Sequence, residues 1–183
     1  MERTESINIR LLTLDDIEGW LKQCEILSYE SGKNDVYFGP YSKHDPYPMD
    51  EIKKNTKERW SKSIDTPGWR RAWGIFYKNR IVGSADIAGG DISKNLHRVD
   101  FGIGIIKEYR NMGLGKELMY MIIDWCKEHP GIFWIDLGVF SDNDKAKLVF
   151  EKVGFEEIGY KDDCWYIDGV SIGETTMTLN VKR

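Results

Sequence analysis

The stretch Phe101–Lys116, with the sequence FGIGIIKEYRNMGLGK, constrains the fold of this chain more than any other segment. Its first half has the apolar pattern of a strand, and an amphipathic helix pattern follows, so the two elements meet across a short glycine-containing turn. Glycines at such a junction let the backbone approach a ligand closely. The free N–H groups of the first helical turn and the positive end of the helix dipole also favour an anion there. The segment therefore predicts a strand–turn–helix unit with a site for a pyrophosphate.

A tight turn that serves only helix packing is the alternative, because isolated glycine motifs are frequent. Two other nucleotide-binding motifs are excluded. Gly115-Lys116 is followed by Glu117, so the chain lacks the P-loop spacing G-x-x-x-x-G-K-[ST]. No second G-x-x-G completes a dinucleotide-binding fingerprint either.

The elements around this unit alternate between strands and helices. Periodicity and turn signals predict strands at 7–11, 72–77, 80–88, 98–106, 133–140, 155–166 and 171–181, and helices at 14–24, 49–64, 114–125 and 143–153. This order, β-α-α-β-β-β-α-β-α-β-β, predicts an α+β fold in which helices cover a twisted sheet. We expect one domain over residues 1–183, because no Pro/Gly/Ser-rich linker divides the chain.

Composition narrows the class of protein. Apolar residues make up 41% of the 183 residues and charged residues 31%, as in soluble globular proteins. The longest apolar runs are too short to cross a bilayer and the N-terminus lacks the apolar stretch of a secretory signal, so we expect a cytoplasmic protein without a membrane partner. A net charge of −4 disfavours nucleic acid as a partner and mildly favours a cationic small substrate. The three cysteines are widely spaced, which predicts neither a disulfide framework nor a zinc site.

A second informative segment follows the strand predicted at 133–140. Together with Arg110-x-x-Gly113-x-Gly115, this segment resembles the GNAT superfamily of N-acetyltransferases. In that family a Q/R-x-x-G-x-G/A loop binds the pyrophosphate of coenzyme A, and an N-x-x-A-x-x-x-Y-x-x-x-G-F segment follows the next strand. Four residues match the second pattern at the same spacing: Asn143, Ala146, Gly154 and Phe155. The two motifs occur in the correct order, and the motif-bearing part covers roughly residues 72–166.

The resemblance implies a mostly antiparallel seven-stranded sheet, flanked by helices and splayed between its fourth and fifth strands, with the pantetheine arm of acetyl-CoA in the gap. It implies direct acetyl transfer from acetyl-CoA to a primary amine, without a metal or a covalent enzyme intermediate. One backbone N–H near Ile103 or Ile105 is expected to face the thioester oxygen. The residues expected to bind the cofactor are Ile103, Ile105, Arg110, Asn111, Gly113, Gly115, Lys116 and Asn143. Lys107, Lys145 and Lys147 are weaker candidates to neutralise phosphate, because single lysines are usually solvated.

One position departs from the family pattern. The family's frequent tyrosine, which commonly protonates the departing thiolate, is Phe150 here. A phenyl ring has no proton to give, so another group or water takes that role, or none is needed. A thiol near its reference pKa is already a good leaving group, so a dedicated acid need contribute little near neutral pH.

Asp100 is the first candidate to accept the proton of the attacking amine, directly or through water. Asp86 is a weaker rival on the neighbouring strand, and His97 precedes the same strand as Asp100 but is more often a surface residue in such a place. Cys126 and Cys164 are discounted as nucleophiles because neither has a histidine partner in its sequence context.

The acceptor cannot be read from the sequence. The aromatic segments 37–41 and 164–166 are candidate walls of its pocket, although each such residue is more often part of a core. A polyamine, an amino acid, an aminoglycoside, a protein N-terminus and a lysine all stay open, as does assembly into a homodimer. The alternative function is a non-catalytic CoA-binding regulatory or interaction module on the same fold.

Overall fold

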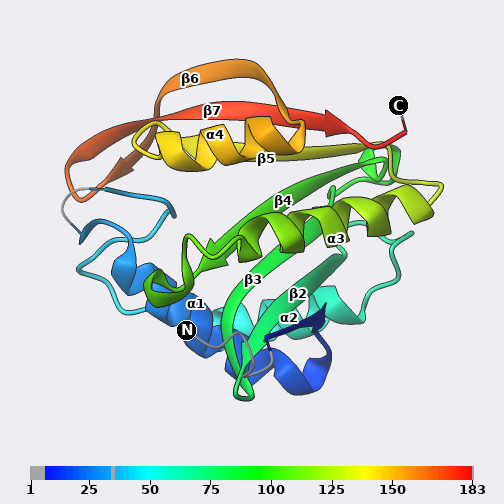
Figure 1. Ribbon diagram of the computed structural model, residues 1–183, viewed down its shortest axis with the longest axis horizontal. Coiled ribbons are helices and arrows are strands. Elements are labelled where there is room, and N and C mark those ends of the chain that lie inside the picture. The colour runs from blue at the N-terminus through cyan, green and yellow to red at the C-terminus, as the bar shows by residue number, and fades with distance from the viewer. Residues whose placement is uncertain (1–6, 34–35, 183) are drawn as a thin grey trace.

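Seven strands form one twisted sheet in the order β1-β2-β3-β4-β5-β7-β6 (Figure 1). The structure, a computed structural model, describes residues 7–33 and 36–182. The strands are β1 (Asn8–Leu11), β2 (Arg70–Tyr77), β3 (Arg80–Gly89), β4 (Arg98–Ile105), β5 (Trp134–Phe140), β6 (Glu156–Ile167) and β7 (Val170–Asn180). The helices are α1 (Ile17–Glu30), α2 (Met49–Ser61), α3 (Leu114–Glu128) and α4 (Asp144–Val153), with short 3-10 turns η1 (Leu14–Asp16), η3 (Ser93–Asn95) and η4 (Lys107–Tyr109). The predicted α+β class and the predicted order of elements are confirmed.

The sheet opens in its middle. All neighbouring strands pair antiparallel except β4 and β5, which run parallel. These two strands pair only where Arg98–Asp100 meets Trp134–Asp136, and they diverge beyond that point (Figure 1). The predicted splay between the fourth and fifth strands is therefore present. Both α3 and α4 begin on the side where the strands have separated.

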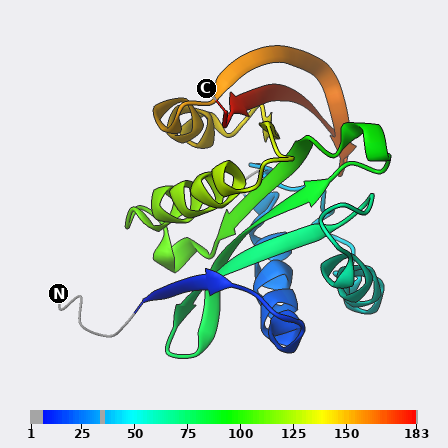
Figure 2. The ribbon, with the colours of Figure 1, turned by 90° about the vertical axis from the view of Figure 1, so that its right-hand side faces the viewer.

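Two helices cover each face of the sheet (Figure 2). On one face α3 buries an apolar stripe that includes Leu118, Ile122 and Cys126, each with 0% exposure, against the central strands. Full burial of a side chain such as Leu or Ile contributes about 1.5–3 kcal/mol, so this stripe fixes α3 firmly on the sheet. On the other face α1 and α2 form a separate cluster around Trp20 and Trp60. Helix α3 therefore fixes the glycine turn to one face of the sheet, while α1 and α2 pack on the other face.

Most predicted boundaries hold within two residues, and three helices differ by more. The helix predicted at 114–125 runs on to Glu128. The helix expected to run to residue 64 ends at Ser61, because Lys62 adopts an extended backbone. The helix expected from residue 14 begins as the turn η1, with a capping box between Thr13 and Asp16, and α1 then extends to Glu30. The strands predicted on either side of residues 78–79, and those on either side of residues 168–169, are joined by turns with positive φ angles. Among the described helices, none is long and apolar enough to span a membrane.

Candidate functional site

The glycine turn before α3 forms an open cradle of backbone N–H groups. Gly113 is the N-cap of α3 with φ +82°, a conformation that L side chains rarely adopt, and a Cβ built there meets no atom within 4 Å. Asn111 also has a positive φ of 62°. Within the described part of the chain, the N–H groups of residues 111–115 donate no hydrogen bond, whereas Lys116 N–H already bonds Gly113 O at 3.1 Å. This phosphate cradle, residues 111–115, has the dipole and the free donors that an anion needs.

The side chain of Arg110 fixes the backbone that leads into the cradle. Its Nε donates to Ile105 O at 2.7 Å, and its guanidinium forms an ion pair with Glu30 at the end of α1. The same Glu30 carboxylate accepts a hydrogen bond from Lys107 N–H at 3.2 Å. The Arg110 side chain is therefore engaged with the protein, and it ties the end of β4 to α1.

The predicted pantetheine strand directs alternate backbone groups into the gap between β4 and β5. Ile106 N–H donates to Val82 O at 3.0 Å, so the even-numbered residues of β4 bond to β3. In an antiparallel pair this alternation turns the backbone groups of Ile103 and Ile105 toward the gap. Because β5 pairs only as far as Asp100, no neighbouring strand takes up those groups there.

The other predicted cofactor residues lie at the N-terminal ends of α3 and α4. Gly115 lies in the first turn of α3, where a Cβ would contact Ile105 Cδ1 at 3.4 Å, and Lys116 follows it, half-buried. Asn143 is the N-cap of α4 and its side-chain oxygen accepts from Ala146 N–H at 3.4 Å, so its amide serves the helix. Of the weaker lysine candidates, Lys147 forms an ion pair with Glu157 at 2.5 Å.

A cavity of about 440 Å³ lies on the opposite face of β4, and we call it the acceptor cavity. Helices α1 and α2, the loop between them and the strands β2, β3 and β4 surround it. Its polar and charged lining includes Cys24, Asn55, Arg59, Arg70, Ser84 and Asp86, and its aromatic lining is Trp20, Phe38, Tyr41 and Tyr47. The cavity reaches β4 at Gly102, Ile103 and Gly104, so it meets the strand that faces the predicted pantetheine gap.

The two acidic candidates share a face of the sheet but have different surroundings. Asp86 lines the acceptor cavity and forms an ion pair with Arg70, Oδ2 to Nε at 2.5 Å. Asp100 lies two residues before Gly102 on β4, outside the cavity lining, and is exposed at its outer edge. Removal of its carboxyl from water by the surrounding sheet, followed by the charges of Asp136 and Asp91, raises the pKa of Asp100. His97, the third candidate, packs its ring against Phe133.

Sequence reasoning missed the two arginines of the cavity. Arg70 begins β2 and Arg59 lies in the last turn of α2, and neither belongs to a motif. In the β2–β3 hairpin Ala72 lies opposite Asp86, so Arg70 occupies the diagonal position on the same face, but this register depends on a bulge between Ile75 and Phe76 that the hairpin pattern does not predict. For Arg59 no local signal exists, because only the packing of α2 on the sheet brings it there.

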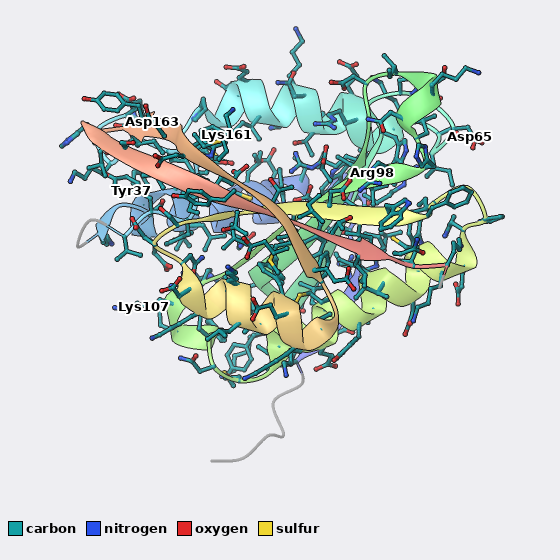
Figure 3. The ribbon with its side chains drawn as sticks, turned by 90° about the horizontal axis from the view of Figure 1, so that it is seen from above. Tyr37, Asp65, Arg98, Lys107, Lys161 and Asp163 are labelled. Carbon is teal, nitrogen blue, oxygen red and sulfur yellow. The ribbon has the colours of Figure 1, made fainter. Side chains whose placement is uncertain are left out.

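The loop between α1 and α2 is fastened to the far hairpin. Asp168, in the turn between β6 and β7, accepts hydrogen bonds from the Tyr37 and Ser42 hydroxyls at 3.0 and 2.7 Å and from Lys43 N–H at 3.0 Å. The Ser42 hydroxyl and the Lys43 N–H hold the pKa of Asp168 below its usual value. Figure 3 shows Tyr37 beside the turn end of this hairpin, far from Arg98. The loop is therefore held over the cavity.

The two aromatic segments expected to line an acceptor pocket separate in the structure. Phe38 to Tyr41 line the cavity, as expected, whereas Tyr37 itself is completely buried. The segment 164–166 does not reach it. Trp165 instead packs on Phe140 and donates its indole N–H to Glu174 at 2.9 Å, because β6 lies at the far edge of the sheet.

Phe150, Cys24 and Cys126 lie in packed surroundings. Phe150 is 7% exposed and lies edge-on to Phe101, with ring centroids 6.3 Å apart, in a cluster with Phe155. Burial raises the pKa of both Cys24 and Cys126 to about 12, so neither thiol ionises near neutral pH. Across residues 7–33 and 36–182, no group of three or more His, Cys, Asp or Glu side chains is placed to hold a metal ion.

Solved structures of known proteins share this architecture over nearly the whole chain. An acetyltransferase of the GNAT family from Streptococcus pneumoniae superposes with a TM-score of 0.81 at 22% identity, covering 96% of this chain and 99% of that one. The protein yncA from Salmonella typhimurium, solved with its cofactor acetyl-CoA, superposes with a TM-score of 0.80 at 13% identity, covering 97% and 95%. At these identities the likeness shows the fold alone.

Sequence comparison gives evidence on the family as well as on the fold. The L-amino acid N-acetyltransferase AaaT of Escherichia coli (strain K12) is 30% identical over 112 residues, which span 61% of this chain and 64% of that relative, less than two thirds of its length. The model of the acetyltransferase (GNAT) family matches residues 30–155, a span that contains the cradle, β4, β5 and α4. The match covers more than half of the chain, and this protein belongs to the GNAT family of acetyltransferases.

Proposed function

We propose that this protein transfers the acetyl group of acetyl-CoA directly to a primary amine. One observation carries the proposal: the acceptor cavity and the phosphate cradle meet at β4 from opposite faces. The cavity reaches Gly102, Ile103 and Gly104, and the same strand leads into the cradle within eight residues of Gly104. An amine that enters from one face and a thioester that enters from the other therefore come together at this strand.

The cradle supplies binding for the cofactor's pyrophosphate through the N–H groups of residues 111–115. The backbone groups of Ile103 and Ile105 hold the pantetheine arm in the gap, and one of their N–H groups stabilises the oxyanion that develops on the thioester carbonyl. Gly113, Gly115, Asn111 and Lys116 surround the phosphates, while Arg110 and Asn143 hold the two edges of the opening.

Asp100 is the proposed proton acceptor, through an intervening water. Its raised pKa strengthens Asp100 as a base, and Asp100 lies on the cavity face of β4. Asp86 is paired with Arg70, so it serves as a fixed negative charge for the substrate ammonium. An ammonium cannot attack, so the bound substrate first loses one proton through water to Asp100. The nitrogen–carbon bond then forms, the second proton on nitrogen leaves to solvent as the carbon–sulfur bond breaks, and solvent protonates the thiolate, because Phe150 cannot.

Release of free thiol from acetyl-CoA tests this function. A panel of primary amines, with acetyl-CoA at saturation and a no-amine control, is expected to give amine-dependent thiol release. Acetyl-CoA alone is expected to raise the melting temperature, since a ligand at 100 times its Kd stabilises the folded state by about 2.7 kcal/mol. Stabilisation by CoA without thiol release from any amine would instead favour the non-catalytic CoA-binding module.

A further inference from the structure

The ion pair between Arg70 and Asp86 leaves polar atoms in the acceptor cavity that make no hydrogen bond to the described residues. Arg70 donates only through Nε to Asp86, and within the described residues its two terminal nitrogens make no hydrogen bond. The second carboxylate oxygen of Asp86, Oδ1, accepts none from those residues either, and it lies 3.4 Å from where a Cβ on Gly102 would stand. The pair therefore presents N–H donors and a carboxylate oxygen side by side, with the oxygen nearest to β4.

A second guanidinium lines the cavity. Arg59 donates through Nε to Gly68 O at 2.9 Å, and its terminal nitrogens make no hydrogen bond within residues 7–33 and 36–182. Two guanidinium groups thus accompany one carboxylate in the lining, and Asp100, outside the lining, interacts with the charge of Arg59. The terminal N–H groups of the two arginines can bind an acceptor that carries its own carboxylate.

Beside the polar Asn55, Thr56 and Ser84, much of the remaining cavity lining is apolar or aromatic. Trp20 is 4% exposed and lies beneath the Arg70 guanidinium, 5.7 Å from ring centroid to Cζ. Tyr41 and Tyr47 pack against each other with centroids 5.5 Å apart, and Phe38 and Ile52 extend the same surface. Such a surface gains free energy by covering a large apolar group of the ligand.

We propose that the acceptor is a free α-amino acid with a large apolar side chain, a conclusion that rests on the acetyltransferase function proposed above. In an α-amino acid one carbon joins the ammonium to the carboxylate, so the two charges match the adjacent Asp86 oxygen and Arg70 nitrogens. Asp86 then holds the amine next to Gly102, where the thioester is expected, and the aromatic lining covers the side chain. A protein N-terminus and a lysine side chain have no carboxylate at that distance.

Three acceptors of one shape test the proposal: L-phenylalanine, L-phenylalanine amide and 2-phenylethylamine. The amide keeps the size and the stereochemistry of phenylalanine but lacks the negative charge of the carboxylate. Its ammonium is also more acidic, so the amide should react faster than phenylalanine if the enzyme does not recognise the carboxylate. We expect kcat/KM to be about 10- to 100-fold higher for phenylalanine than for either analogue, as a charge-assisted bidentate contact provides. Equal or faster turnover of the analogues would refute the amino-acid proposal and leave the acetyltransferase function standing. Absence of thiol release with all amines would refute both.

The variant Arg70→Gln tests whether Arg70 recognises the carboxylate of the acceptor. We expect it to raise KM for phenylalanine about 10-fold or more and to leave kcat/KM for the amide within about threefold, with acetyl-CoA affinity unchanged. Arg71→Gln is the matched control, because Arg71 donates instead to Trp60 O and Lys62 O at the end of α2. This control should lose stability and keep the discrimination. If Arg70→Gln does not fold, Arg59→Gln gives the same readout. Discrimination that survives in both cavity variants would overturn the assignment.

Discussion

The phosphate cradle and the acceptor cavity are built in opposite ways. The cradle is a short stretch of one chain, residues 111–115, and its donors are backbone N–H groups. The cavity is assembled from side chains of two helices, a loop and three strands that are distant in sequence. A backbone site depends on conformation and therefore on glycine, whereas a side-chain site depends on packing and register. The two regions should respond to mutation accordingly.

The largest effect is expected for Gly113→Glu. The substitution places a side chain and a negative charge in the open space of the cradle, where the phosphates are expected, so acetyl-CoA binding should fall below detection by calorimetry. Positive φ also costs a non-glycine residue about 1–2 kcal/mol of stability. Gly169→Glu is the matched control, because Gly169 has φ +83° and equally open surroundings in the β6–β7 turn. Cofactor binding that survives in the Gly113 variant would place the phosphate site elsewhere.

The next largest effect is expected at Asp100, which lies beside the acceptor cavity on the same face of β4. Asp100→Asn should reduce the rate on the acceptor by about 10²-fold or more, within the range of general-base effects, and leave acetyl-CoA affinity intact. The deficit should be largest below the pKa of the acceptor ammonium and shrink as pH rises, because solvent then deprotonates the amine unaided. Asp86→Asn, by comparison, should mainly raise KM for the acceptor. A pH–rate profile parallel to that of the wild type would remove Asp100 from the mechanism.

Stability gives an independent check on Asp100. Its folded pKa is raised above the unfolded value, so the folded state binds the proton more tightly and loses stability as pH rises through these two values. At neutral pH the ionised carboxylate therefore opposes folding, and Asp100→Asn should be as stable as the wild type or slightly more so in denaturant titrations. The difference should disappear below the unfolded pKa of about 3.9. A carboxylate with a structural role would give a loss of stability instead.

The same contrast explains what could be predicted from the sequence. Gly113 could be found because a strand pattern, a glycine and a helix pattern adjoin in the chain, and only the backbone there has to be right. Arg70 could not be found in this way, because a β-bulge decides which face of the sheet its side chain occupies. A regular hairpin around the turn at residues 78–79 would set Arg71 opposite Asp86, but the register shifts by one between Ile75 and Phe76, which brings Arg70 to that face.

The fold itself was readable for the same local reasons. Periodicity gave each strand and helix its type, and the positive φ angles of the two hairpin turns agree with their residues. The sequence placed Asp100 and Asp86 on neighbouring strands and favoured Asp100, but it could not show their surroundings. Asp86 pairs with Arg70, whereas Asp100 lies near the carboxylates of Asp136 and Asp91. Contacts between distant elements decide those surroundings.

A smaller effect is expected at the edge of the cradle. Arg110→Ala removes the hydrogen bond to Ile105 O and the ion pair with Glu30, so the loop should lose order and acetyl-CoA affinity should fall about 3- to 10-fold. Glu30→Gln separates the two explanations. If Arg110 acts by holding the loop, Glu30→Gln should weaken affinity as well. If the guanidinium instead contacts phosphate, releasing it from Glu30 should leave affinity unchanged or raise it, and calorimetry distinguishes the two results.

The smallest effect is expected for Phe150→Tyr. The ring is nearly buried among Phe101 and Phe155, and the wild-type protein already manages its thiolate without a phenol, so kcat near neutral pH should stay within about twofold. The pH profile is more informative than the rate. A phenol that donates to the thiolate would add a decline in kcat near its pKa of about 10, which a phenyl ring cannot produce. An unchanged profile with a stability loss of about 1 kcal/mol would mean that the hydroxyl is buried without reaching the sulfur. Complete loss of activity in a folded variant would show that Phe150 packs directly against the cofactor, and the position would then belong to the side-chain-built part of the site.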